Sequence, residues 1–218
     1  MQHTLNQLGG NVLASLRALV PNRFLTLDEA LYLAQRQANR LLELSGGAVV
    51  PVPSSIVTDQ PRITVEHDSR LIALALSGCS DWDIRRRTWV ISLNPVEPRR
   101  RRRFTMLHEY KHIIDYPSPG IRPSRYAYQR PAAEIVTDYF AGCVLMPKRL
   151  VAAAYYDGIQ RPADLAQLFD VSKEAVQVRL AQIALAEPLS PNRRRFASTP
   201  RAARYYRSAA SHLLEVAA

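Results

Sequence analysis

Two histidines four positions apart are the residues of this chain whose types and spacing most directly indicate chemistry. They enclose a glutamate in the segment His108-Glu109-Tyr110-Lys111-His112. In a helix, side chains at i and i+4 lie one turn apart on the same face, so both imidazoles can reach one cation. Glu109 lies beside them, where its carboxylate can reach a water on that cation without binding the cation itself. This HExxH arrangement is typical of zinc peptidases.

A third protein ligand is required, because zinc hydrolases use three and leave the fourth position to water. Glu134 lies near the start of the next predicted helix, and Asp138 follows one turn later on the same face. We predict that Glu134 binds the metal and that Asp138 accepts the free ring N–H of a ligating histidine, which fixes the ring's tautomer and direction. Two imidazoles and a carboxylate suit Zn2+ best, while the sequence leaves the identity of the divalent ion open.

The metal interpretation has an alternative, since a short motif of this kind also occurs by chance. The histidines would then be hydrogen-bonded polar groups on a half-buried helix, and Glu134 and Asp138 would face solvent. Three observations favour the metal. The motif lies in an apolar segment, where unpaired imidazoles are costly, and a carboxylate pair follows at a workable distance. Cys79 and Cys143 lack the spacing of a competing thiolate site.

A long helix is predicted ahead of the motif. Thr26 can cap it, and Glu29 three residues later completes a capping box. Apolar residues then recur at helical spacing until Gly46 and Gly47 end the pattern. We expect this helix to serve packing alone.

Residues 48–103 are expected to supply a small sheet. Residues 63–65 alternate as a strand, and residues 89–93 form the clearest strand, ended by Asn94-Pro95. Residues 71–76 fit either a strand or a buried helix, because periodicity does not separate the two. The strand over residues 89–93 could pair with an extended substrate by β-augmentation, or it could be an ordinary strand of the sheet.

Helices are expected over most of the remaining chain. The segment around the histidines forms one, and the segment that carries Glu134 forms a second, stopped at Pro147. Residues 161–186 indicate two further helices around a turn at residues 170–172, with Ser172 capping the second. The arginine runs at residues 85–87 and 99–103 are expected in solvated loops or as attractants for an acidic substrate.

The strings RRRFTMLHEYKHIID and EIVTDYFAGCVLMP resemble the ImmA/IrrE family of zinc metallopeptidases. Members typically show a strand ending in Asn, then F-T-x-x-H-E-x-x-H, and later E-x-x-A-N-x-F-A-x-x-L-L-M-P. Here ISLN matches the strand, Phe104-Thr105 matches the lead-in, and Leu145-Met146-Pro147 matches the closing signature. The string LAQLFDVSKEAVQVRL is similar to the family's helix-turn-helix-like end. The resemblance covers about residues 25–185.

This resemblance implies a zinc endopeptidase with Glu134 as the third ligand and Glu109 as the general base. The zinc would acidify a water and polarise the scissile carbonyl, while Glu109 would carry the water's proton to the leaving amine. It also implies a regulatory role, in which a helix-turn-helix transcriptional repressor is cleaved and repression is relieved. Tyr126 and Tyr128, between the two metal helices, are candidate stabilisers of the oxyanion, or else ordinary loop aromatics.

The chain departs from the family pattern at three positions near the site. Lys111 replaces the usual Gly, and Thr137 replaces a common Ala. Lys111 is expected to point away from the metal, because its charge would oppose cation binding. Asp138 stands where the family often has Asn, so its predicted role rests on spacing alone.

The charge balance suggests an acidic partner such as nucleic acid. Lys+Arg 29 against Asp+Glu 19 gives a net charge of +10. In the helix-turn-helix-like segment, Lys173 and Gln177 could contact base edges, and Arg179 is expected at a polar position. The basic tail has interleaved aromatics and could bind nucleic acid through Arg193, Arg194 and Arg195. The alternatives are a helical hairpin packed on the core and a solvated tail.

These observations predict an α+β fold: a small twisted sheet packed with helices, a zincin-like HExxH helix and helix-turn-helix-like C-terminal helices. We divide the chain into an N-terminal segment (1–24), a zincin-like metallopeptidase domain (25–186, with 161–186 as the helix-turn-helix-like subregion) and a basic linker with a C-terminal helix (187–218). No apolar run reaches the ~18 residues of a membrane span, so we expect a cytoplasmic protein. The alternative to a peptidase is a non-catalytic DNA- or repressor-binding regulator with a structural or idle metal site.

Overall fold

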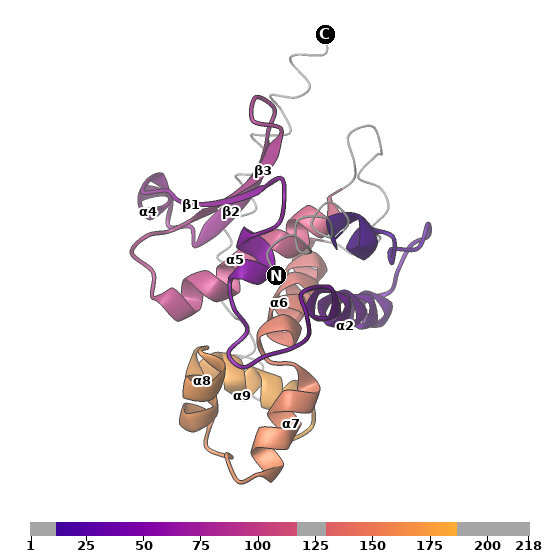
Figure 1. Ribbon diagram of the computed structural model, residues 1–218, viewed down its shortest axis with the longest axis vertical. Coiled ribbons are helices and arrows are strands. Elements are labelled where there is room, and N and C mark those ends of the chain that lie inside the picture. The colour runs from indigo at the N-terminus through magenta and orange to yellow at the C-terminus, as the bar shows by residue number, and fades with distance from the viewer. Residues whose placement is uncertain (1–11, 117–129, 187–218) are drawn as a thin grey trace.

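The computed structural model describes residues 12–116 and 130–186. The chain has the predicted α+β fold, with a three-stranded mixed sheet and helices around it. The sheet lies at one end of the molecule and helices α7 to α9 lie at the other, with α5 and α6 between them (Figure 1). The predicted boundaries at residues 24 and 186 stay a proposal, because residues 1–11 and 187–218 lie outside the described part.

The sheet contains β1 (Ile63–His67), β2 (Gly78–Asp83) and β3 (Thr88–Leu93) in the order β1-β3-β2. Strand β3 pairs in parallel with β1 and antiparallel with β2. The strand predicted over residues 89–93 is therefore internal, and the prediction that it could accept a substrate strand is wrong, because both of its edges are paired. Helix α4 (Arg70–Leu74) resolves the ambiguity over residues 71–76 in favour of a helix.

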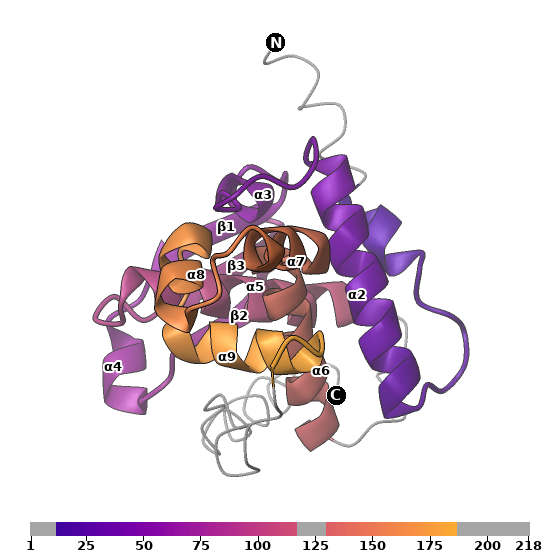
Figure 2. The same ribbon diagram turned by 90° about the horizontal axis from the view of Figure 1, so that it is seen from below.

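Helix α2 (Leu27–Leu44) begins as its sequence predicts. The Glu29 backbone N–H donates to the Thr26 hydroxyl, and the Thr26 backbone N–H donates to the Glu29 carboxylate at 2.9 Å, which completes the capping box. Gly46 and Gly47 follow the helix with φ of 92° and 101°, a region that favours glycine. The buried face of α2 packs along α6, and Figure 2 shows α2 running down one side of the molecule.

Helix α5 (Arg99–Asp115) begins earlier than expected and includes the whole arginine run. The prediction that residues 99–103 form a solvated loop is wrong: they make the first turns of the helix that carries the histidines, and Arg103 is buried. Arginine is a good helix former. The carboxylate that pairs with Arg103 belongs to Asp170, which lies 67 residues away in the sequence. The other arginine run, at residues 85–87, lies in the exposed turn between β2 and β3, as expected.

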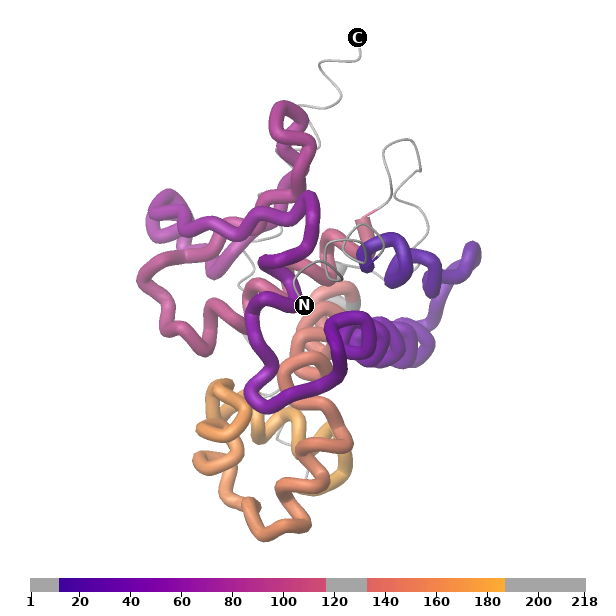
Figure 3. The backbone as a smooth tube through the Cα atoms, in the orientation of Figure 1, coloured from indigo at the N-terminus to yellow at the C-terminus, as the bar shows by residue number. Residues whose placement is uncertain are grey.

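The C-terminal half of the described chain is helical. Helix α6 (Arg130–Leu145) ends just before Pro147, as predicted, and α7 (Lys148–Tyr156) begins directly after it. Helices α8 (Pro162–Phe169) and α9 (Lys173–Gln182) flank the predicted turn, and the Ala175 backbone N–H donates to the Ser172 hydroxyl at 3.1 Å. Figure 3 follows this path at the end of the molecule opposite the sheet. A short helix, α3 (Ser55–Thr58), precedes β1.

Within residues 12–116 and 130–186, no helix is both long and apolar enough to cross a membrane.

Candidate metal centre

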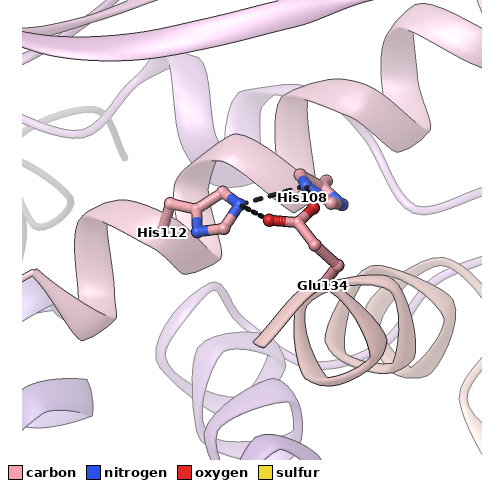
Figure 4. Close-up of side chains that lie close together, drawn as sticks. All are labelled: His108, His112 and Glu134. Carbon is pink, nitrogen blue, oxygen red and sulfur yellow. Dashed lines mark hydrogen bonds and ion pairs between the residues drawn. The ribbon is translucent and has the colours of Figure 1, made fainter. Parts of the chain in front are cut away.

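The three residues predicted as metal ligands lie together between α5 and α6. His108 and His112 project from adjacent turns of α5, and Glu134 reaches them from the start of α6 (Figure 4). Their candidate ligand atoms all lie within 4.8 Å of one another. The Nε2 atoms of the two histidines are 3.1 Å apart, and the Glu134 carboxylate lies 3.2 Å from Nε2 of His108 and 3.5 Å from Nε2 of His112.

These separations suit a small tetrahedral ion. With metal–ligand bonds of about 2.0–2.1 Å, tetrahedral zinc keeps its ligand atoms about 3.3–3.4 Å apart. The observed separations of 3.1, 3.2 and 3.5 Å bracket that value. The donor set, two imidazoles and one carboxylate, is also one that zinc favours. The side chains of His108, His112 and Glu134 remain 14%, 21% and 29% exposed, so solvent can reach the cluster.

The surroundings of the cluster shift the pKa values of the two imidazoles in opposite directions. Burial opposes the charged form of His108, but hydrogen bonds to Asp138 and Glu134 and the charge of Glu109 outweigh it and raise the pKa of His108 to about 10. Burial and the adjacent charge of His108 lower the pKa of His112 to about 3. Burial also opposes ionisation of Glu134, but the histidines outweigh it, and the pKa of Glu134 is lowered. The cluster thus holds a carboxylate facing two rings of which one stays neutral.

Asp138 and Lys111 each have a charged or polar partner close to the cluster. The Asp138 carboxylate lies 2.8 Å from Nδ1 of His108 and so can accept that ring's N–H, which turns Nε2 toward the cluster. Lys111 is buried, and its ammonium group pairs with Asp115 one turn further along α5. The lysine charge is therefore balanced by a carboxylate on its own helix.

Glu109 is buried beside the cluster, where it has a hydrogen-bond partner that the sequence did not predict. The Ser80 hydroxyl, on strand β2, donates to the Glu109 carboxylate at 3.0 Å. Strand β2 was not predicted, because the segment Gly78-Cys79-Ser80-Asp81-Trp82-Asp83 lacks a clear apolar alternation. The signal that was present is the alternation of Asp81 and Asp83 with Ser80 and Trp82, which places the two acidic residues on the opposite face of a strand.

The helix-turn-helix-like pair is attached to both helices that carry the cluster. Asp170, in the turn between α8 and α9, lies 2.8 Å from the buried Arg103 guanidinium on α5. Arg103 also donates to backbone carbonyls of Asp170 and Val52. On the other side, Arg179 Nε of α9 donates to the Met146 carbonyl at the end of α6 at 3.0 Å. The expectation that Arg179 is an outward polar position is therefore wrong.

The candidate nucleic-acid contacts receive no structural test. Lys173 is exposed and Gln177 is half-buried on α9. Their contact with bases stays a prediction. Arg193, Arg194 and Arg195, and the candidate oxyanion stabilisers Tyr126 and Tyr128, lie outside the described residues.

The similarity of this chain to known proteins identifies its family. A solved structure described as a Mycobacterium tuberculosis transcriptional regulator has 18% sequence identity and a TM-score of 0.47; the match covers 68% of this chain and 46% of that one, so it spans less than half of that protein. No curated protein sequence matches the chain. A family profile described as the IrrE N-terminal-like domain (Peptidase_M78) matches residues 70–181, just over half of the chain and a range that includes both metal helices. The chain therefore belongs to the IrrE N-terminal-like peptidase family, which its motifs predicted.

Proposed function

We propose that this chain is a zinc-dependent endopeptidase. The observation that carries the proposal is the convergence of His108, His112 and Glu134 at separations suited to tetrahedral zinc. Membership of a peptidase family supports it, and so does the buried carboxylate of Glu109 next to the first histidine.

Each residue has a role in the proposed hydrolysis. A bound zinc ion would supply the Lewis acidity that activates a water and polarises the scissile carbonyl. Glu109 accepts the proton of the attacking water and returns it to the leaving amine. Ser80 donates to the Glu109 carboxylate at 3.0 Å and so fixes its direction. Asp138 holds the Nδ1–H of His108 at 2.8 Å, which keeps Nε2 free to bind the metal.

The substrate is proposed to lie along strand β2. This strand is at the edge of the sheet, and within the described residues no strand pairs with its outer side. Backbone N–H and C=O groups on such an edge can bind an extended peptide by β-augmentation. Because Ser80 of β2 contacts Glu109, a peptide on this edge passes beside the proposed general base.

The biological substrate that we propose is a helix-turn-helix transcriptional repressor in the cytoplasm, whose cleavage would relieve repression. The family membership supports a peptidase, and the net charge of +10 favours an acidic protein or a protein bound to nucleic acid. The competing possibility, a regulator that binds DNA or a repressor without cleaving it, is an outcome of the experiments below.

Metal analysis of the purified protein tests the site itself. We expect about one zinc per wild-type chain and a loss of zinc in His108→Ala, because three protein ligands are the usual complement of such sites. Glu174→Gln, an exposed glutamate on α9, is the matched control and should keep its zinc. Equal zinc content in wild type and His108→Ala would refute the site.

Cleavage by the zinc-loaded protein tests the activity. Glu109→Gln should keep zinc and lose hydrolysis of a proteome-derived peptide library, read by mass spectrometry, because the amide cannot accept the water proton. Cleavage or derepression that survives Glu109→Gln would refute the peptidase. Salt-sensitive DNA binding that disappears when residues 187–218 are removed would favour the regulator.

A further inference from the structure

Three aromatic rings form a continuous row beside the place where β2 packs against α5. Trp82 of β2 and Trp89 of β3 lie opposite each other in the sheet, with ring centroids 5.5 Å apart and an edge-to-face angle of 64°. Trp89 in turn meets Tyr116, which follows α5, at 5.1 Å and 69°. We call these three residues the aromatic row. It links the free edge of the sheet to the end of the helix that carries the histidines.

The aromatic row continues the line of contacts that passes the proposed general base. On β2, Gly78 packs so closely on Thr105 that an added Cβ would lie 2.6 Å from its methyl group, and Ser80 contacts Glu109. These two contacts are two residues apart on β2, a rise of about 6.7 Å, and four residues apart on α5, a rise of about 6 Å. The strand and the helix therefore run side by side in the same direction. Trp82 is the next residue of β2 on this face.

Tyr116 joins the aromatic row from the end of the helix that carries the histidines. Its backbone N–H donates to the His112 carbonyl at 2.8 Å, one turn earlier in α5. Residues at i and i+4 share a helical face, so Tyr116 lies one turn beyond a proposed metal ligand. Its side chain is 48% exposed, while Trp82 is half-buried and Trp89 is buried. The two outer rings of the row, Trp82 and Tyr116, are therefore partly exposed, and both pack on the buried Trp89.

We propose that the aromatic row is the subsite that selects the substrate, and that it takes a large apolar side chain. The inference rests on the proposed function. Side chains of an extended peptide alternate between faces, so those that point inward are two residues, or about 7 Å, apart. When one residue lies opposite Ser80, beside Glu109, the next inward-facing residue lies opposite Trp82. Aromatic rings contribute large apolar contact area there and favour aromatic or long aliphatic partners.

The two tryptophans make the subsite directly observable. The chain contains only two, and both belong to the aromatic row. Intrinsic tryptophan fluorescence therefore reports on this place and no other. We would use the full-length chain with zinc and the Glu109→Gln substitution, so that peptides bind without turnover. The probes are a blocked, alanine-rich hexapeptide and versions with one phenylalanine at each successive position.

Phenylalanine at one particular position should tighten binding about tenfold and shift the tryptophan emission, the discrimination expected of an apolar pocket. Tyr116→Ala should abolish that preference, and Tyr116→Phe should keep it, because the ring supplies the contact. Tyr32→Ala, which removes a 65% exposed tyrosine on α2, is the control and should change nothing. Equal binding of all peptides, or an unchanged preference in Tyr116→Ala, would overturn the inference.

Cleavage of a proteome-derived peptide library separates this inference from the proposed function. Wild type should cut at sites with a large apolar residue at one fixed position near the bond, and Tyr116→Ala should cut without that preference. Cleavage by wild type with no apolar preference would overturn the subsite and leave the peptidase standing. Absence of cleavage, with the fluorescence preference intact, would overturn the peptidase and support the subsite as a binding site.

Discussion

Replacing Asp170 by Asn should destabilise the fold far more than loss of an ordinary ion pair. Its carboxylate lies 2.6 Å from Arg99, 3.2 Å from Arg100 and 2.8 Å from Arg103. Arg103 is only 7% exposed, and burial lowers its pKa while Asp170 opposes that effect. The amide would leave a buried guanidinium without a counter-charge, which costs about 3–5 kcal/mol. Asp170 has φ of 51°, and Asn tolerates that region well, so backbone strain adds little.

Urea unfolding followed by circular dichroism measures this cost, with a chelator present so that metal binding adds nothing. In a thermal melt of the same samples, each kcal/mol corresponds to about 2–4 °C in Tm for a chain of this length, so a fall of about 6–20 °C is expected. Asp164→Asn is the matched control. That carboxylate lies 2.7 Å from Arg161, but the two side chains are 41% and 82% exposed, so its loss should be much smaller. Similar losses in the two variants would show that burial of the charge is not what matters.

Three further substitutions test separate contacts. Gly78→Ala should cost about 1–3 kcal/mol in urea unfolding, because its Cβ would lie 2.6 Å from the Thr105 methyl group; Gly142→Ala, with nothing within 4 Å, should not destabilise. Ser80→Ala should lower kcat for peptide cleavage with zinc content unchanged, since the hydroxyl holds the proposed general base; a lower zinc content would contradict that separation. Thr26→Ala should cost about 1 kcal/mol of unfolding free energy, and no loss would mean that the capping box adds nothing.

Local signals in the sequence predicted the ends of several elements correctly. The capping box at Thr26 and the cap at Ser172 depend on groups three residues apart. Pro147 ends one helix because its own ring cannot continue it. Interactions of this range are complete within a few residues, so the sequence alone contains both partners in plain view.

Contacts between segments that are distant in the chain could not be predicted from the sequence. The arginine run was expected in a loop because its counter-charge, Asp170, lies 67 residues from Arg103. Ser80 was missed because it meets Glu109 across 29 residues, from a strand whose polar composition concealed it. In both cases the sequence shows the residue type, but it does not show which distant residue that side chain contacts.

The candidate ligands fall between these two cases. The spacing of His108 and His112 on one helix is local and follows from the helical repeat. Glu134 belongs to another helix, and its position near them depends on how α5 and α6 pack. Its selection from the sequence rested on the requirement for a third ligand, a chemical constraint that acts across any distance in the chain.

The packing of α8 and α9 gives the helix-turn-helix-like pair a structural role in a domain with a candidate metal site. A metal site needs its ligands held to within about 0.5 Å, yet the ligands come from two helices that α8 and α9 touch at separate points. Asp170 receives Arg103 from α5, and Arg179 donates to the Met146 carbonyl at the end of α6. Because one helical pair contacts both, its turn and inner face are committed to the core. A second role in reading DNA would have to use only the outer face of α9, where Lys173 lies.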